Sequence, residues 1–188
     1  AFYHQSMLSE AIYLERLVQD LLELSRLQNM DFAIEKQEIY LKDLFTDAIR
    51  SAGQLASGKN IGIRADLENA GIGFLGDYGR LRQMLMVVLG NAIKFSPENS
   101  EVEVTFAGRR LTVRDQGPGI ASEDLPWIFD RFYKSRPEEN KSGTGLGLAI
   151  AKEIARRHGI GLSVNSAEGQ GAAFVFDFGG GEKLSDPK

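Results

Sequence analysis

A glycine-rich stretch, GTGLG at residues 143–147, runs directly into a predicted helix and could bind phosphate. Glycines allow a backbone to approach a ligand closely, and the free N–H groups and dipole at a helix start favour phosphate oxygens. Taken alone the stretch is weak evidence, because such clusters are often turns. It follows a loop, unlike a dinucleotide fingerprint, and no Lys-Ser or Lys-Thr follows it, as a Walker loop would require.

A second stretch, DQGPGI at residues 115–120, follows a predicted strand. The carboxylate of Asp115, placed at a strand end, could accept a hydrogen bond from an amine such as that of adenine. Gly117 and Gly119 would let a flat base approach the backbone. The alternative is an ordinary turn built from Asp, Pro and Gly, and in isolation the turn is the better interpretation.

A third stretch, NAIKF at residues 91–95, lies in a predicted helix. Asn91 and Lys94 are three residues apart and therefore share a helix face. An asparagine oxygen can bind Mg²⁺, which keeps most of its waters, and a lysine supplies charge to a phosphate. Asn91 could equally be a buried amide whose hydrogen bonds are satisfied within the protein.

The elements that must position these stretches follow from hydrophobic periodicity. Helices are predicted over residues 7–27, 41–56, 78–95 and 146–157, and strands near residues 39–41, 61–67, 72–75, 101–107, 110–115, 162–166 and 172–178. Asp77 is a candidate N-cap of the third helix, and Pro97 stops that helix. Three helices covering one face of a mixed sheet predict an α+β fold, a two-layer α/β sandwich, preceded by one N-terminal helix.

That N-terminal helix carries apolar residues at heptad spacing. Met7, Leu14 and Leu21 share one heptad position, and Leu17 and Leu24 share the other. The pattern suits either a core helix or a helix packing in a bundle or against a second chain, and periodicity cannot choose between them.

Composition limits the function classes. The chain has 188 residues, 43% hydrophobic and 26% charged, which predicts one compact domain with a short appendage. The absence of cysteine excludes thiolate metal sites and cysteine nucleophiles. A net charge of −4 argues against a nucleic-acid partner. No apolar run approaches the roughly 20 residues of a membrane-spanning helix.

Four motifs in this order resemble the ATP-binding domain of sensor histidine kinases, in the GHKL superfamily that includes type II topoisomerases, Hsp-type chaperones and mismatch-repair ATPases. They are VLGNAIKFSP, DQGPGI, WIFDRFYK and GTGLGLAIAKEIARRHG. In addition, LERLVQDLLELSRL resembles the second helix of the kinase dimerisation module. The resemblance covers about residues 12–178. It implies a Bergerat ATP-binding fold, with a dimerisation helix at 1–28, a linker at 29–36, a catalytic domain at 37–178 and a disordered tail at 179–188.

The resemblance also implies roles for individual residues, with ATP and Mg²⁺ as cofactors. Asp115 would bind the adenine amine, Asn91 the Mg²⁺ ion and Lys94 the phosphates, while Phe129 and Phe132 would anchor a lid over residues 131–144. The implied nucleotide-binding set is Asn91, Lys94, Phe95, Asp115, Gly117, Gly119, Ile120, Arg131, Lys134, Gly143, Thr144, Gly145, Leu146, Gly147 and Leu148.

The reaction implied is transfer of the ATP γ-phosphoryl group to a histidine for relay to a response regulator. Two departures matter. Val87 stands where the family usually has a second Asn, which predicts weaker metal binding and little hydrolysis. Neither His4 nor His158 has the context of a phosphoacceptor, so we expect the acceptor helix outside this chain and His158 to be structural.

The resemblance further implies a homodimeric parent anchored in the cell membrane, with this part of it in the cytoplasm. With one dimerisation helix missing, we expect the fragment to be monomeric and unable to phosphorylate itself. Two other interpretations are a degenerate nucleotide-binding docking module and a GHKL-type ATPase.

Overall fold

The computed structural model describes residues 2–29, 31–135 and 143–180, with side chains described from Met7 onward. The helices are α1 (Phe2–Gln28), α2 (Leu41–Ser57), α3 (Tyr78–Phe95) and α4 (Gly147–Arg157), and short 3-10 helices span Glu68–Ala70 and Phe178–Gly180. The strands are β1 (Gln37–Tyr40), β2 (Gly62–Asp66), β3 (Gly73–Gly76), β4 (Glu101–Ala107), β5 (Arg110–Arg114), β6 (Gly161–Ser166) and β7 (Ala172–Asp177).

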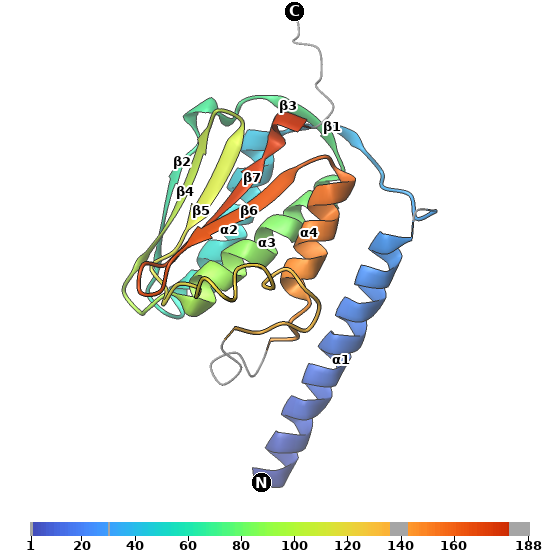
Figure 1. The fold of residues 1–188 in the computed structure, drawn as a ribbon, viewed down its shortest axis with the longest axis vertical. Coiled ribbons are helices and arrows are strands. Elements are labelled where there is room, and N and C mark those ends of the chain that lie inside the picture. Colours follow the sequence, from blue (N-terminus) through green and yellow to red (C-terminus); the bar gives the residue numbers. More distant parts are fainter. Residues whose placement is uncertain (1, 30, 136–142, 181–188) are drawn as a thin grey trace, which may run out of the picture.

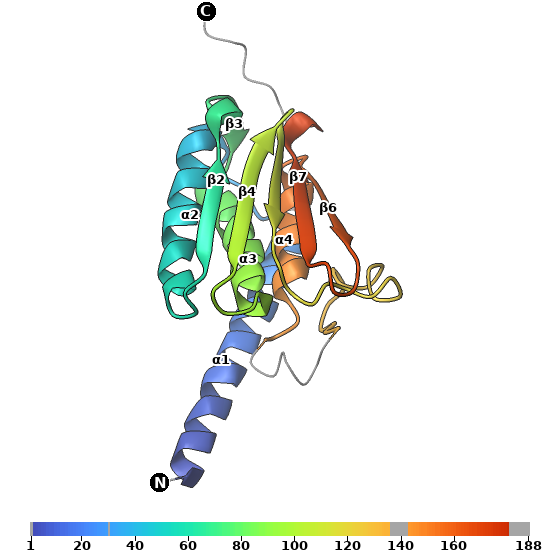
Figure 2. The same cartoon turned by 90° about the vertical axis from the view of Figure 1, so that its left-hand side faces the viewer.

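Five strands form one mixed sheet, in the order β2-β4-β5-β7-β6. The β2–β4 pair is parallel and the other pairs are antiparallel. Strands β1 and β3 form a separate antiparallel pair. Helices α2, α3 and α4 lie side by side on one face of the large sheet (Figures 1 and 2). The predicted two-layer α/β sandwich with three covering helices is confirmed.

The core lies between these two layers, where strand alternation places apolar side chains on the helix side. In β4, Val102, Val104 and Phe106 are buried, and β5 contributes Leu111 and Val113. Val104 pairs with Val113 and Phe106 with Leu111 across the β4–β5 ladder. The period-2 pattern of EVEVTF therefore reflects a strand with one face on the core.

Helix α3 begins and ends where its flanking residues predict. The Asp77 side chain accepts the Arg80 N–H at 3.1 Å, so Asp77 is the N-cap. At the other end, the Lys59 ammonium donates to the carbonyl oxygens of Ile93, Lys94 and Ser96, at 3.1, 2.8 and 2.6 Å. Carbonyls that a helix end leaves unpaired are thus bonded by a cation.

Helix α1 extends away from the sandwich, and its C-terminal half packs on α4 (Figures 1 and 2). Leu24 and Leu27 are buried in this contact, and Leu17 is partly buried. Met7 and Leu14, from the other heptad position, are 68% and 55% exposed. The two heptad positions thus lie on different faces of α1: one packs on the sandwich at α4, and the other is uncovered within the described residues.

Some predictions fall outside the described residues. These are the middle of the predicted lid (residues 136–142) and residues 181–188 of the predicted tail, whereas residues 179 and 180 belong to a 3-10 turn. Among the described helices, none combines the length and apolarity needed to span a bilayer.

Candidate functional site

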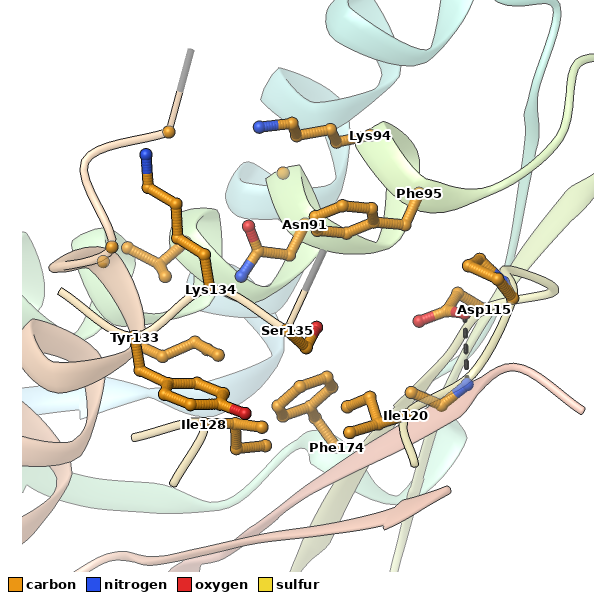
Figure 3. A pocket seen from close by; sticks show the side chains of 18 of the residues that line it. Asn91, Lys94, Phe95, Asp115, Ile120, Ile128, Tyr133, Lys134, Ser135 and Phe174 are labelled. Atoms are coloured by element: carbon orange, nitrogen blue, oxygen red, sulfur yellow. Dashed lines mark hydrogen bonds between the residues drawn. The ribbon is translucent and has the colours of Figure 1, made fainter. Parts of the chain in front are cut away.

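A cavity of about 350 Å³ lies between α3, the loop after β5 and the start of α4 (Figure 3). It brings together the three stretches singled out in the sequence. Its lining consists of Val87, Gly90, Asn91, Lys94, Phe95, Asp115, Pro118, Gly119, Ile120, Ile128, Tyr133, Lys134, Ser135, Gly143, Thr144, Gly145, Gly147, Leu148, Ala172 and Phe174.

Asp115 provides a fixed carboxylate at one end of the cavity. Its Oδ1 atom accepts the backbone N–H groups of Gly117 and Ala172, at 2.8 and 3.1 Å, and the residue is 7% exposed. Burial raises the pKa of the carboxyl above its ordinary value, and the two backbone hydrogen bonds oppose that shift. Figure 3 shows a carboxylate oxygen directed into the cavity, with Ile120 and Phe174 nearby. This end therefore offers a hydrogen-bond acceptor in apolar surroundings.

Two glycines make the close packing around Asp115 possible. Gly119 has a φ of 72°, and a Cβ atom there would lie 1.9 Å from the Ala167 carbonyl oxygen. Gly171 has a φ of 71°, and a Cβ atom there would lie 2.1 Å from the Asp115 carbonyl oxygen. Both positions require glycine for its left-handed backbone and its lack of a side chain.

The opposite end of the cavity is cationic. Lys94 and Lys134 extend toward it from α3 and from the loop, on the side away from Asp115 (Figure 3). The Lys94 ammonium lies 5.4 Å from the centre of the Phe95 ring. Burial, and then the charge of Lys134, lowers the pKa of Lys94 below its ordinary value. Two cations close to the α4 N-terminus favour an anionic ligand group.

Asn91 points into the cavity between these two ends (Figure 3). The described residues contain no group of three acidic, histidine or cysteine side chains that could hold a metal by itself. A neutral amide oxygen instead suits Mg²⁺ bound mainly by phosphate oxygens and water. Val87, one helical turn before Asn91, offers no ligand atom, and its Cγ1 would lie 3.3 Å from a Cβ atom on Gly147.

Most predicted nucleotide-binding residues line the cavity, but three do not. The backbone N–H of Gly117 donates to Asp115 Oδ1, and Gly117 itself does not line the cavity. Leu146 is fully buried in the core. Arg131 donates to Gln28 of α1 and does not line the cavity, so its predicted phosphate contact stays a prediction.

The predicted roles of the two phenylalanines also differ. Phe129 packs edge-on against Phe174, with ring centroids 6.4 Å apart, as an anchor would. Phe132 is 55% exposed and contacts the glycine-rich stretch through its backbone, whose N–H donates to the Gly145 carbonyl oxygen at 2.8 Å. Its φ of 63° is unusual for a non-glycine residue. The predicted set omitted seven other lining residues besides Val87, namely Gly90, Pro118, Ile128, Tyr133, Ser135, Ala172 and Phe174. Four of them stand inside the motifs quoted above: Gly90 in VLGNAIKFSP, Pro118 in DQGPGI, and Ile128 and Tyr133 in WIFDRFYK.

His158 is structural, as predicted. Its Nε2 accepts the Asp77 N–H at 3.0 Å, and its Nδ1 lies 2.8 Å from the Ile154 carbonyl oxygen, to which it must donate. The ring is therefore neutral, and burial lowers its pKa. The side chain of His4 lies outside the described residues.

The family profile described as histidine kinase-, DNA gyrase B-, and HSP90-like ATPase matches residues 76–179, more than half of the chain. The chain belongs to this family. The matched segment begins at the end of β3 and includes α3, the Asp115 loop, the described parts of the loop that follows, and α4. It therefore contains every residue that lines the cavity.

The proteins to which this chain is similar include sensor histidine kinases. The Salmonella typhi sensor protein QseC is 40% identical over 161 residues, 85% of this chain and 36% of QseC. Full-length ShkA in complex with AMPPNP matches with a TM-score of 0.80 at 29% identity, over 97% of this chain and 39% of ShkA. Histidine kinase ThkA in complex with response regulator TrrA matches with a TM-score of 0.73 at 25% identity, over 93% of this chain and 49% of ThkA. The chain thus spans little more than a third of QseC and ShkA.

Proposed function

We propose that this chain is the ATP-binding catalytic domain of a sensor histidine kinase, joined to one helix of its dimerisation module (residues 1–28) by a linker at 29–36. The observation that carries the proposal is a single cavity with a buried carboxylate at one end and two lysines at the other. An adenine nucleotide has a matching polarity, because its exocyclic amine donates a hydrogen bond and its phosphates are anionic. The family profile and the AMPPNP complex of ShkA support the same ligand.

In this arrangement the Asp115 carboxylate accepts the adenine amine, and Gly119, Ile120 and Phe174 contact the base. Lys94 and Lys134 neutralise the phosphates. The backbone of Gly143, Thr144, Gly145 and Gly147 approaches them at the start of α4. Asn91 would supply one oxygen to Mg²⁺, and the ion would neutralise part of the phosphate charge.

The proposed reaction transfers the γ-phosphoryl group of ATP to an imidazole nitrogen. The bond from the γ-phosphorus to the bridging oxygen of ADP breaks, and a phosphorus–nitrogen bond forms. A neutral imidazole attacks with its own lone pair, so the protein mainly positions the groups and neutralises charge. Val87 cannot activate water, which disfavours an ATPase.

The partners are proposed on the same basis. The acceptor histidine lies on a helix outside this chain, and the phosphoryl group passes from it to a response regulator, the class of partner seen with ThkA. We propose a homodimeric parent anchored in the cell membrane, with this part of it in the cytoplasm. The exposed apolar side of α1 is the surface that the missing helices would cover.

Calorimetric titration with Mg²⁺ and ATP tests the site. Asp115→Asn replaces an acceptor oxygen with a donor amide, so we expect roughly a hundredfold loss of affinity. Asp66→Asn, an exposed carboxylate on β2, is the matched control and should bind like the unchanged chain. Equal ATP affinity of the Asp115→Asn variant and the unchanged chain would contradict the proposed contact between Asp115 and the base.

Activity needs a separate assay, in which the missing acceptor helix is supplied as a peptide with γ-labelled ATP. Label on the peptide histidine supports the kinase. If ATP binds but the peptide never becomes labelled, a nucleotide-binding docking module is the better description. Steady phosphate release without any acceptor would instead indicate an ATPase.

A further inference from the structure

Helix α1 contacts two residues that line the cavity. The Thr144 hydroxyl donates to Asp20 Oδ2 at 2.6 Å, and the Lys134 ammonium lies 5.6 Å from the centre of the Tyr13 ring. Tyr13 and Asp20 are part-buried and share a face of α1 with Leu17 and Leu24, since all four follow a 4-3-4 spacing. The face that packs on the catalytic domain is thus also in contact with the cavity wall.

The contact with Asp20 occupies the only proton of Thr144. A threonine hydroxyl has one O–H donor, and here the carboxylate accepts it, while the same oxygen accepts the Leu146 N–H at 3.3 Å. Thr144 therefore cannot donate to a phosphate while this contact persists. Its hydroxyl instead links Asp20 of α1 to the backbone N–H of Leu146, at the start of α4.

Asp20 also brings a negative charge to the part of the cavity where anions are favoured. The α4 N-terminus and the two lysines attract phosphate. Only the Thr144 hydroxyl separates the Asp20 carboxylate from that N-terminus, so this carboxylate interacts with the same helix dipole and repels a phosphate bound there. A phosphate and the Asp20 carboxylate are in this sense competing anions.

We propose that Asp20 lowers the affinity of the cavity for phosphate-bearing nucleotides, so that docking of α1 and binding of nucleotide oppose each other. This inference rests on the proposed nucleotide site. By linkage the opposition is reciprocal: bound nucleotide must weaken the docking of α1 by the same factor.

The docking of α1 has other supports, so the contribution of Asp20 can be isolated. Leu24 and Leu27 are buried, Glu23 forms an ion pair with Arg80, and Arg157 donates to the Leu27 carbonyl oxygen at 2.9 Å. Asp20→Asn keeps the side-chain shape and an acceptor oxygen for Thr144 while it removes the charge.

The test compares ATP with adenosine, which lacks phosphates, by calorimetry at low salt. We expect Asp20→Asn to bind ATP roughly two- to tenfold more tightly and to bind adenosine unchanged. Glu15→Gln, which removes a charge from the exposed side of α1, is the control and should leave both affinities unchanged. Unchanged or weaker ATP binding in Asp20→Asn overturns the inference, as does an equal gain for adenosine. If the unchanged chain binds no ATP, the proposed function falls as well.

Hydrogen exchange gives an independent measurement of the reciprocal effect. Saturating ATP should accelerate amide exchange in residues 17–28 of the unchanged chain, and adenosine should not. In Asp20→Asn the acceleration by ATP should be smaller. Equal exchange with and without ATP in the unchanged chain would contradict the proposal.

Discussion

The Nε2 atom of His158, at the end of α4, accepts the backbone N–H of Asp77, the N-cap of α3, at 3.0 Å. This bond joins the ends of two helices that both line the cavity proposed to bind nucleotide. It requires a neutral imidazole, because a protonated ring has no free acceptor. The packing of α3 against α4 is therefore tied to the protonation of one buried side chain.

The stability of the domain should consequently fall below pH 6.5. The pKa of His158 is lowered in the folded state, so the unfolded chain binds more protons as the pH decreases. This contribution is complete above the ordinary histidine pKa of 6.5 and is lost as the pH falls toward the lowered folded value. The slope can reach about 1.4 kcal/mol per pH unit.

Urea unfolding at several pH values between 7 and 5 measures this effect. His158→Gln should be less stable at pH 7 and should lack most of the slope in that window, because glutamine does not titrate. Parallel slopes in the two proteins would show that another group carries the pH dependence.

Gly171 should tolerate alanine much less well than Gly169. Both have a left-handed backbone, with φ of 71° and 76°, so alanine costs each about 1–2 kcal/mol. A Cβ atom on Gly171 would in addition lie 2.1 Å from the Asp115 carbonyl oxygen, whereas nothing lies within 4 Å of one on Gly169. Denaturant unfolding should show Gly171→Ala at least about 1–3 kcal/mol less stable than Gly169→Ala. Equal losses would mean that the Asp115 loop shifts at little cost.

Arg157 should hold α1 and the linker on the domain. Its guanidinium donates to the carbonyl oxygens of Leu27, Asn29 and Phe32, at 2.9, 3.0 and 2.6 Å. Arg157→Met leaves these groups without that donor, and we expect a local loss of about 1–3 kcal/mol, seen as faster amide exchange in residues 24–32.

Arg156→Met is the neighbouring control for that experiment. Arg156, whose side chain is 57% exposed, forms an ion pair with the part-buried Glu153 at 2.6 Å, and this pair lies within α4 and does not involve α1 or the linker. Exchange in residues 24–32 should stay unchanged in this variant. If both variants accelerate exchange equally, general destabilisation of α4 explains the result.

Val87→Asn should make nucleotide binding more dependent on Mg²⁺. Val87 lines the cavity one helical turn from Asn91, so the new amide adds an oxygen beside the proposed metal position. We expect the ratio of ATP affinities with and without Mg²⁺ to rise roughly tenfold, the lower end of the effect of groups around metal sites. Val87→Ala removes the same methyl groups without adding a ligand atom and should leave the ratio unchanged.

The regular elements could be predicted closely because local signals set their limits. Asp77 and Pro97 determine α3, and EVEVTF determines β4, independently of the rest of the fold. The Asp115 loop and the start of α4 could be assigned to one site because their motifs occur in a known order.

Features that depend on long-range contacts were harder to predict. Leu14 and Leu17 are equally apolar, and only the position of α4 decides that Leu17 packs and Leu14 does not. Phe129 and Phe132 likewise differ in burial: Phe129 packs on Phe174, whereas Phe132, with its left-handed backbone, is 55% exposed. Arg131 turns to α1, a partner that no local pattern identifies.

The contact of Lys59 with the last turn of α3 has a consequence for ligand entry. Because its ammonium fixes the backbone beneath Lys94 and Phe95 during folding, that wall of the cavity is already ordered when a ligand arrives. The facing wall is held differently, because Thr144 and Lys134 contact Asp20 and Tyr13 of α1. A displacement of α1 would therefore alter one wall of the cavity and leave the wall supported by Lys59 in place.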